Sequence, residues 1–233
     1  SRELSVKNIE EIDYFARYFE MDSYDGCNLN CIMCPLGKDI YDGGGAISQK
    51  LFKKIVAELA PYADWIKLVC LSRNGEPLLN KNIASMIRQL KEVNIKRVNF
   101  STNATALTEK KSYELIKSGL DEIRFSIDGF TKETFEKVRK GGKYEKILEN
   151  CLRFIKIRDE IGKGKPQVQI RFVEQKANTH EVESWKNLFS NSQKMVTELT
   201  ERKNKLLSQL NERDQQPKAQ AEKKGRTTEG LRI

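Results

Sequence analysis

Residues 27–34 read Cys-Asn-Leu-Asn-Cys-Ile-Met-Cys and bring three thiols together in one short stretch of chain. Thiolates grouped in this way can hold a metal centre. A structural zinc site needs four ligands, and the fourth would have to be His180, Cys70 or Cys151. None of these is close in sequence, and the two cysteines lie in apolar stretches typical of a core. Three ligands therefore favour an iron–sulfur cluster with one iron left open.

The rest of the chain alternates between short apolar strands and amphipathic helices. The expected strands cover residues 16–24, 65–71, 97–101, 122–127 and 167–173. The expected helices cover residues 48–63, 82–93, 108–118, 131–139, 144–161 and 179–189. Strands that alternate with helices form a parallel sheet with right-handed crossovers. Because a closed eight-stranded barrel needs about 250 residues, we expect an α/β fold with a partial barrel of five to six parallel strands. The pattern also fits a doubly wound sheet.

The cysteine-rich loop follows the first expected strand, and α/β barrels place their active sites at the carboxyl ends of strands. Local signals define two helix starts, with Ser48 and Thr108 as N-caps. In the helix that begins after Ser48, we expect Leu51, Ile55 and Leu59 to face the core.

The composition is that of a globular protein, with 38% hydrophobic and 32% charged residues among 233. No stretch approaches the ~20 apolar residues of a membrane helix, and the first residues lack the pattern of a secretory signal. Five cysteines, three of them clustered, favour a reducing compartment, so we expect a cytoplasmic protein. The net charge of +9 is typical of a lysine-rich, solvated surface, and we expect neither a membrane nor a nucleic-acid partner.

The composition changes near residue 190. We expect residues 1–190 to form the partial barrel and residues 191–213 to form a polar helix, either a short coiled coil or a docking helix for a protein partner. Residues 214–233 lack apolar content, which predicts a disordered tail.

Further motifs follow the later strands in chain order. They are Asn74-Gly75-Glu76-Pro77, Ser101-Thr102-Asn103-Ala104, Phe125-Ser126-Ile127-Asp128-Gly129 and Val138-Arg139-Lys140-Gly141-Gly142. Together with the cysteine loop, this series resembles the radical SAM superfamily, and in particular the branch that carries a C-terminal SPASM domain. The resemblance covers about residues 16–190. Because no cysteine follows Cys151, we expect this sequence to lack the SPASM domain and its auxiliary clusters.

The resemblance implies both cofactors and a reaction. Cys27, Cys31 and Cys34 would hold a [4Fe–4S] cluster, and S-adenosylmethionine (SAM) would bind its open iron. An electron from an external donor would cleave SAM to a 5′-deoxyadenosyl radical, which would abstract hydrogen from a substrate. Related enzymes act on peptides and sugars, so we expect a small-molecule or peptide substrate.

The resemblance also implies contacts to the methionine part of SAM. Gly75 would let the backbone approach the methionyl group, and Glu76 would accept a hydrogen bond from its ammonium. Asn74 stands where the family has a further glycine.

The later motifs supply polar side chains for the rest of SAM. Ser101, Asn103 and Ser126 would bind the ribose or the carboxylate, and Arg139 would pair with the carboxylate. Met33 would pack beside the adenine.

The sequence also allows two other functions. The chain could be truncated and bind a cluster or SAM without turnover, or it could be a zinc-binding interaction module. Arg171 lies on an alternating strand and is expected to face solvent, although it could point into the mouth of the barrel. His180 is expected at the start of a helix and not as a catalyst.

Overall fold

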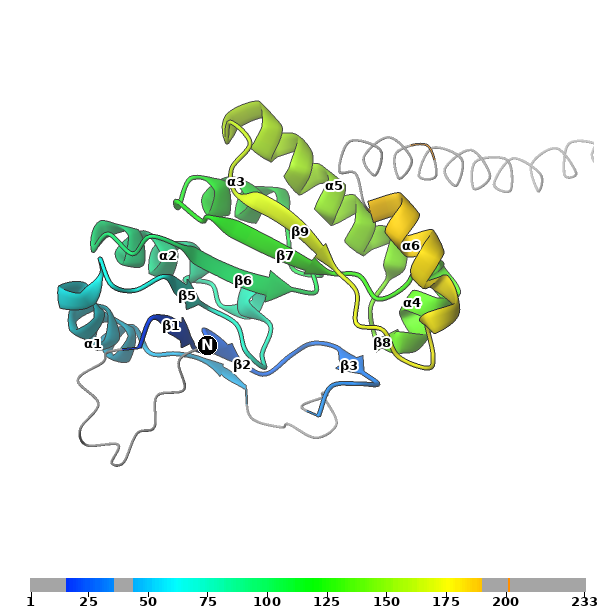
Figure 1. Cartoon of the computed structure of the whole chain (residues 1–233), viewed down its shortest axis with the longest axis horizontal. Coiled ribbons are helices and arrows are strands. Elements are labelled where there is room, and N and C mark those ends of the chain that lie inside the picture. The colour runs from blue at the N-terminus through cyan, green and yellow to red at the C-terminus, as the bar shows by residue number, and fades with distance from the viewer. Residues whose placement is uncertain (1–15, 36–43, 190–200, 202–233) are drawn as a thin grey trace, which may run out of the picture. The chain divides into compact units, whose positions relative to one another are not determined.

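The computed structural model describes residues 16–35, 44–189 and 201 (Figure 1). The predicted helix of residues 191–213, apart from residue 201, and the predicted tail of residues 214–233 lie outside the described residues. The chain divides into two compact units after Val182, and the site discussed below lies in the first. Within the described residues, no helix is both long and apolar enough to cross a bilayer.

The first unit is built on a parallel sheet of five strands in the order β1-β5-β6-β7-β9. These strands are β1 (Tyr18–Glu20), β5 (Leu68–Cys70), β6 (Val98–Thr102), β7 (Glu122–Ser126) and β9 (Gln167–Arg171). All four pairings are parallel. The expected α/β partial barrel is thus confirmed with five strands, the lower end of the predicted range.

Helices connect the strands, and one more helix follows the last strand. They are α1 (Gln49–Leu59), α2 (Ile83–Glu92), α3 (Glu109–Ile116), α4 (Lys132–Val138), α5 (Tyr144–Ile161) and α6 (Val182–Phe189). Single 3₁₀ turns occur at η2 (Ala60–Tyr62), η3 (Pro77–Leu79) and η4 (Thr179–Glu181). Every helix predicted within residues 44–189 is present, and the longest, α5, has the predicted bounds.

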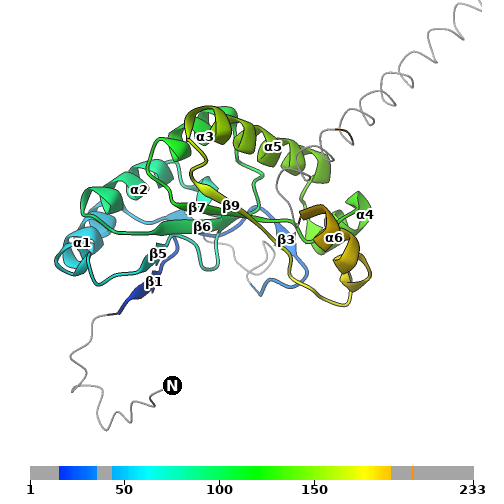
Figure 2. The ribbon, with the colours of Figure 1, turned by 45° about the horizontal axis from the view of Figure 1, so that its top comes forward.

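The helices α1, α2, α3 and α5 lie along one face of the sheet (Figure 2). Alternate strand residues point to this face, and Phe100, Ile123 and Phe125 are fully buried there. Phe125 meets Phe154 of α5 edge to face, with ring centroids 5.7 Å apart. The remaining strand residues therefore point to the opposite face, which in a barrel is the inner one.

The helix caps confirm the local predictions, but the core face of α1 differs. Ser48 Oγ accepts a hydrogen bond from the backbone of Leu51, as an N-cap should. Leu51 itself is 50% exposed, whereas Phe52, Val56 and Leu59 are buried. The prediction of Leu51 on the core face was wrong because the apolar stripe begins one residue later, at the larger Phe52.

Two short antiparallel pairs were not predicted. Strand β2 (Tyr24–Asp25) pairs with β4 (Gly45–Ala46), and β3 (Asn30–Cys31) pairs with β8 (Arg139–Lys140). The expected first strand of residues 16–24 is accordingly divided into β1 and β2. These pairs lie beyond the carboxyl ends of the parallel strands and hold the cysteine loop.

Candidate functional site

The cysteine loop is fixed by backbone pairing with a segment far along the chain. Strands β3 and β8 are labelled in Figure 1. In their pairing Cys31 lies opposite Arg139, and the Ile32 amide donates to the Val138 carbonyl at 3.0 Å. A turn then brings Cys34 back, and its amide donates to the Cys31 carbonyl at 3.0 Å. Backbone hydrogen bonds therefore fix the second half of the loop, from Cys31 to Cys34.

The thiols are partly or fully buried, and polar donors face two of their sulfurs. Burial raises the pKa of Cys31 to about 11, although Arg139 acts against this rise. Burial also raises the pKa of Cys27. The Asn103 amide donates to Cys27 Sγ at 3.6 Å, and Arg139 Nη1 donates to Cys31 Sγ at 3.7 Å. Such donors stabilise thiolates, and hydrogen bonds to the sulfurs help to determine the reduction potential of an iron–sulfur cluster.

The donor set fits a cluster better than a single ion. In the part of the chain that the structure describes, no three His, Cys, Asp or Glu side chains are grouped to hold one metal ion. In a [4Fe–4S] cluster each thiolate binds its own iron, so the sulfurs need not converge on one point. Three thiol ligands with hydrogen-bond donors at Cys27 and Cys31 meet this requirement.

The loop of residues 73–76 follows β5 and is held by the carboxylate of Asp22, which no sequence motif indicated. Asp22 Oδ1 accepts from the amides of Arg73 and Asn74, each at 2.8 Å, and from Gly75 at 3.3 Å. Asp22 could have been identified from its position two residues after β1, because functional residues gather at the carboxyl ends of parallel strands.

Gly75 is required by the packing of the chain itself. A Cβ at this position would lie 1.8 Å from the Tyr24 carbonyl oxygen and 3.0 Å from that of Gly26. The next amide, Glu76 N, donates to the Gly26 carbonyl at 2.8 Å. The loop thus lies directly against the backbone that leads into the cysteine loop.

Glu76 is 2% exposed, and its carboxylate has three internal donors. They are Leu78 N at 2.9 Å, Thr102 Oγ1 at 2.6 Å and Asn103 N at 2.7 Å. Burial raises its pKa, and these hydrogen bonds act in the opposite direction. Glu76 therefore joins η3 to the end of β6, and its role as an acceptor for the SAM ammonium stays a prediction.

Asn103 connects the end of β6 to the cysteine loop. Its amide nitrogen donates to Asn28 Oδ1 at 3.0 Å as well as to Cys27 Sγ. Its amide oxygen accepts from Thr105 Oγ1 at 2.6 Å, and this hydroxyl also accepts from Asn28. Asn28 and Thr105 were not predicted, because the contacts that Asn28 makes with Asn103 and Thr105 join positions more than seventy residues apart.

Arg139 joins the cysteine loop to the end of β7. Its Nε and Nη2 lie 2.7 and 2.6 Å from Asp128 Oδ2, and its Nη1 faces Cys31 Sγ. The Asp128 side chain is fully buried, and burial raises its pKa while Arg139 opposes the rise. The guanidinium thus lies between a carboxylate and a cysteine sulfur, and its pairing with SAM stays a prediction.

The remaining predicted residues lie at the same end of the sheet. Ser101 and Ser126 are half-buried near the ends of β6 and β7, and Met33 is half-buried in the turn before Cys34. Cys70 and Cys151 are buried, as the core assignment predicted, and His180 is exposed in η4.

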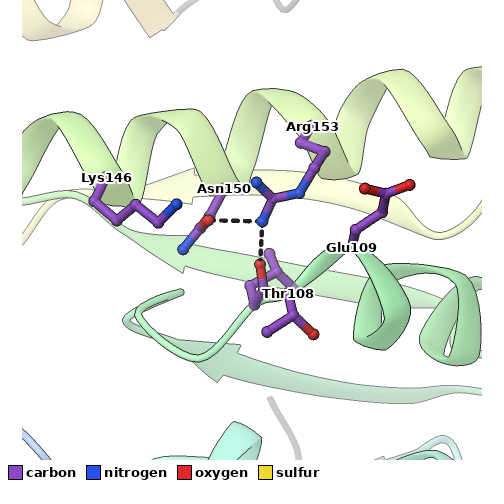
Figure 3. A pocket seen from close by; sticks show the side chains of 6 residues that line it. Thr108, Glu109, Lys146, Asn150 and Arg153 are labelled. Atoms are coloured by element: carbon purple, nitrogen blue, oxygen red, sulfur yellow. Dashed lines mark hydrogen bonds between the residues drawn. The ribbon is translucent and has the colours of Figure 1, made fainter.

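Helix α5 supports the loop that follows Asn103 (Figure 3). Asn150 donates to the Ala104 carbonyl at 2.9 Å and accepts from Arg153, which also donates to the Leu107 carbonyl at 2.6 Å. Ala104 has a positive φ of 57°, a conformation that costs a non-glycine residue free energy and needs outside support. These side chains line a cavity of about 240 Å³ at the start of α3.

Replacing Asn150 by alanine should lower the free energy of unfolding by about 1–3 kcal/mol, because the buried Ala104 carbonyl would keep only the longer hydrogen bond from Leu107 N at 3.3 Å and Arg153 would lose an acceptor. The measurement is urea unfolding followed by circular dichroism. Lys146→Ala is the matched control on the same cavity wall, where the side chain is 61% exposed, and it should change stability by less than about 0.5 kcal/mol. Equal effects of both changes would contradict the supporting role of Asn150.

Comparison with known proteins agrees with this geometry. The family model of the Radical SAM superfamily matches residues 21–160. A probable GTP 3′,8-cyclase of Saccharolobus islandicus is 30% identical over 156 residues, which cover 67% of this chain and 47% of that protein. The tungsten-containing aldehyde ferredoxin oxidoreductase cofactor-modifying protein of Pyrococcus furiosus is 28% identical over 166 residues, or 70% of this chain and 45% of that protein. The chain spans about half the length of these curated relatives.

Solved structures show the same fold. Streptococcus suis SuiB bound to S-adenosylmethionine superposes with a TM-score of 0.60 at 18% identity, covering 74% of this chain and 37% of SuiB. BtrN in complex with AdoMet and 2-DOIA superposes with a TM-score of 0.50 at 21% identity, covering 68% of this chain and 57% of BtrN. The family match, which includes the three-cysteine loop and the motifs after the second, third and fourth strands, shows that the chain belongs to the radical SAM superfamily.

Proposed function

We propose that the chain binds a [4Fe–4S] cluster through Cys27, Cys31 and Cys34 and reductively cleaves SAM. When bound, the cluster supplies the electron that splits SAM into methionine and a 5′-deoxyadenosyl radical, which abstracts a substrate hydrogen. The observation that carries the proposal is that one short loop beyond the carboxyl end of the parallel sheet holds all three thiols, two of them faced by Asn103 and Arg139.

The residues of the chain would position and shield the cosubstrate. The backbone of residues 73–75, held by Asp22, would face the methionyl group. Glu76 would orient this loop and the end of β6 through its internal hydrogen bonds. We also propose Asn74 and Gly75 as part of the methionine site.

The other side chains proposed to line the SAM site come from later elements. Ser101, Asn103 and Ser126 offer hydroxyl and amide groups at the ends of β6 and β7. Arg139 offers positive charge beside Cys31, and Met33 offers a soft apolar surface in the cysteine turn.

Electron paramagnetic resonance (EPR) tests the proposal. The protein is reconstituted anaerobically with iron and sulfide, reduced with dithionite and measured with and without SAM. We expect a [4Fe–4S]⁺ signal that changes when SAM is added, together with 5′-deoxyadenosine in the reaction mixture. A signal indifferent to SAM and no 5′-deoxyadenosine would contradict the proposal.

A second candidate is a protein that binds the cluster and SAM without turnover. It is a candidate because the contacts described above involve the cysteine loop and the residues proposed to bind SAM. Turnover also needs substrate contacts, which in such barrels come from several strand ends. An EPR response to SAM without 5′-deoxyadenosine would support this candidate.

Radical SAM enzymes require an electron donor and a substrate. For this chain we propose an external reductant and a peptide or sugar-like substrate, with a protein partner able to dock on the predicted helix of residues 191–213. We also propose a cytoplasmic location, because five unpaired cysteines suit a reducing compartment.

A further inference from the structure

The inner face of the sheet carries a row of polar side chains next to the proposed SAM site. On β7, Glu122 and Arg124 alternate with residues buried under the helices. In the register, Arg124 lies opposite Gln169 of β9, and Ser126 lies opposite Arg171. Arg124 and Arg171 therefore point to the same face from neighbouring strands.

Glu122 already has its full set of donors. Its side chain is completely buried, and it forms ion pairs with Arg97 and Arg124. Gln169 Nε2 donates to it at 3.1 Å, and Asn99 Nδ2 donates at 3.3 Å. Burial acts to raise the pKa of Glu122, but the hydrogen bonds from the two arginines lower it overall. This carboxylate is therefore ionised and neutralises at most one guanidinium.

Arg171 adds a positive charge that has no matching carboxylate. Its side chain is exposed, and among the described residues no ion pair joins it to an acidic group. Partial burial and the nearby Arg124 lower the pKa of Arg171, while Glu122 acts in the opposite direction. The register also places the exposed Glu20 of β1 on this face, in line with Cys70, Asn99 and Glu122. The face thus holds three guanidiniums and two carboxylates, which leaves an excess of one positive charge.

We propose that Arg124 and Arg171, here called the arginine face, bind an anionic group of the substrate, either a phosphate or a carboxylate. Guanidinium groups bind both oxyanions through paired N–H donors. Arg171 ends β9 beside Ser126, so the bound group would lie on the inner face below the cosubstrate. This inference rests on the proposed function, since it names the substrate class of the same site.

Isothermal titration calorimetry with two small anions tests the inference. Pyrophosphate and malonate are titrated separately into the anaerobically reconstituted full chain with SAM present, at low ionic strength. We expect one of them to bind with a stoichiometry of about one. Tighter binding of pyrophosphate identifies a phosphate site, and tighter binding of malonate identifies a carboxylate site.

Three variants make the test specific. Arg171→Gln should weaken binding about tenfold, as expected for the loss of one charge-assisted contact, and Arg171→Lys should restore part of it. Arg88→Gln is the matched control, because this exposed arginine lies on α2 and should leave binding unchanged. Equal affinities of the wild type and Arg171→Gln, or equal losses in the Arg171→Gln and Arg88→Gln variants, would overturn the inference.

The same samples separate this inference from the proposed function. The EPR signal of the wild type and of Arg171→Gln is recorded with and without SAM. If the EPR signal responds to SAM but anion binding does not depend on Arg171, only the proposal that the arginine face binds an anion is refuted. Loss of the response in the wild type itself refutes the proposed function, and the titrations still decide whether the face binds an anion.

Discussion

Alanine in place of Cys27, Cys31 or Cys34 should remove the iron–sulfur cluster. The expected iron content falls from about four atoms per chain to background, because each thiolate is proposed to bind its own iron. Formation of 5′-deoxyadenosine should fall to background with it. Iron and sulfide analysis after anaerobic reconstitution, together with the absorbance of the cluster, provides the measurement.

The structure indicates that these changes affect the ligands and not the fold. Cys31 is held in β3 by backbone pairing with β8, and an alanine retains every backbone hydrogen bond of that pair. Cys27 and Cys34 are only partly buried, so their loss leaves no large cavity. Circular dichroism of the apo variants should therefore match the wild type.

Cys151→Ala provides the matched control. This thiol is 2% exposed in α5, and its full burial raises its pKa, so it is a core residue with no ligand role. The variant should lose about 1 kcal/mol of stability and keep its iron. Iron retained by the Cys27→Ala variant, or iron lost equally by Cys151→Ala, would show that the cluster is not held where we propose.

The sequence predicted the parallel sheet well because periodic patterns report burial. The five strands and the helices between them each had an apolar stripe or a capping residue, as at Ser48 and Thr108. The two-residue strands β3 and β8 were missed, because a pair of residues has no periodicity and the pairing joins positions 108 residues apart, Cys31 and Arg139.

The candidate site was predicted as a set of residues, but not as a set of contacts. The motifs named Glu76, Asn103 and Arg139, yet each side chain has internal partners that no motif specifies. Asp22 was missed for the same reason, because its role is to accept hydrogen bonds from three backbone amides that lie more than fifty residues away in sequence. Local patterns give residue types, whereas these roles depend on tertiary contacts.

Gly75→Ala is the second change for which we expect a large effect. Its new Cβ would lie 1.8 Å from the Tyr24 carbonyl oxygen, far inside van der Waals contact. The loop cannot move aside freely, because Asp22 holds the amides of residues 73–75 and Glu76 N is bonded to Gly26. We expect a loss of about 3 kcal/mol, which lowers the melting temperature by roughly 10 °C.

Gly45→Ala is the control for this change. Gly45 lies in β4 of the neighbouring pair, and a Cβ there would meet nothing within 4 Å. Its melting temperature should stay within about 2 °C of the wild type. Thermal unfolding of both apo variants under reducing conditions, followed by circular dichroism, gives the comparison.

The two variants also separate two reasons for a glycine in this loop. If the close approach to Tyr24 is the reason, Gly75→Ala is destabilised without any cofactor, and its response to SAM falls because the loop is displaced. If the glycine serves only the approach of SAM, the apo variant melts like the wild type, and only the EPR response to SAM is lost. Because the steric conflict involves backbone atoms of the chain itself, we expect the first result, and an unchanged melting temperature would refute it.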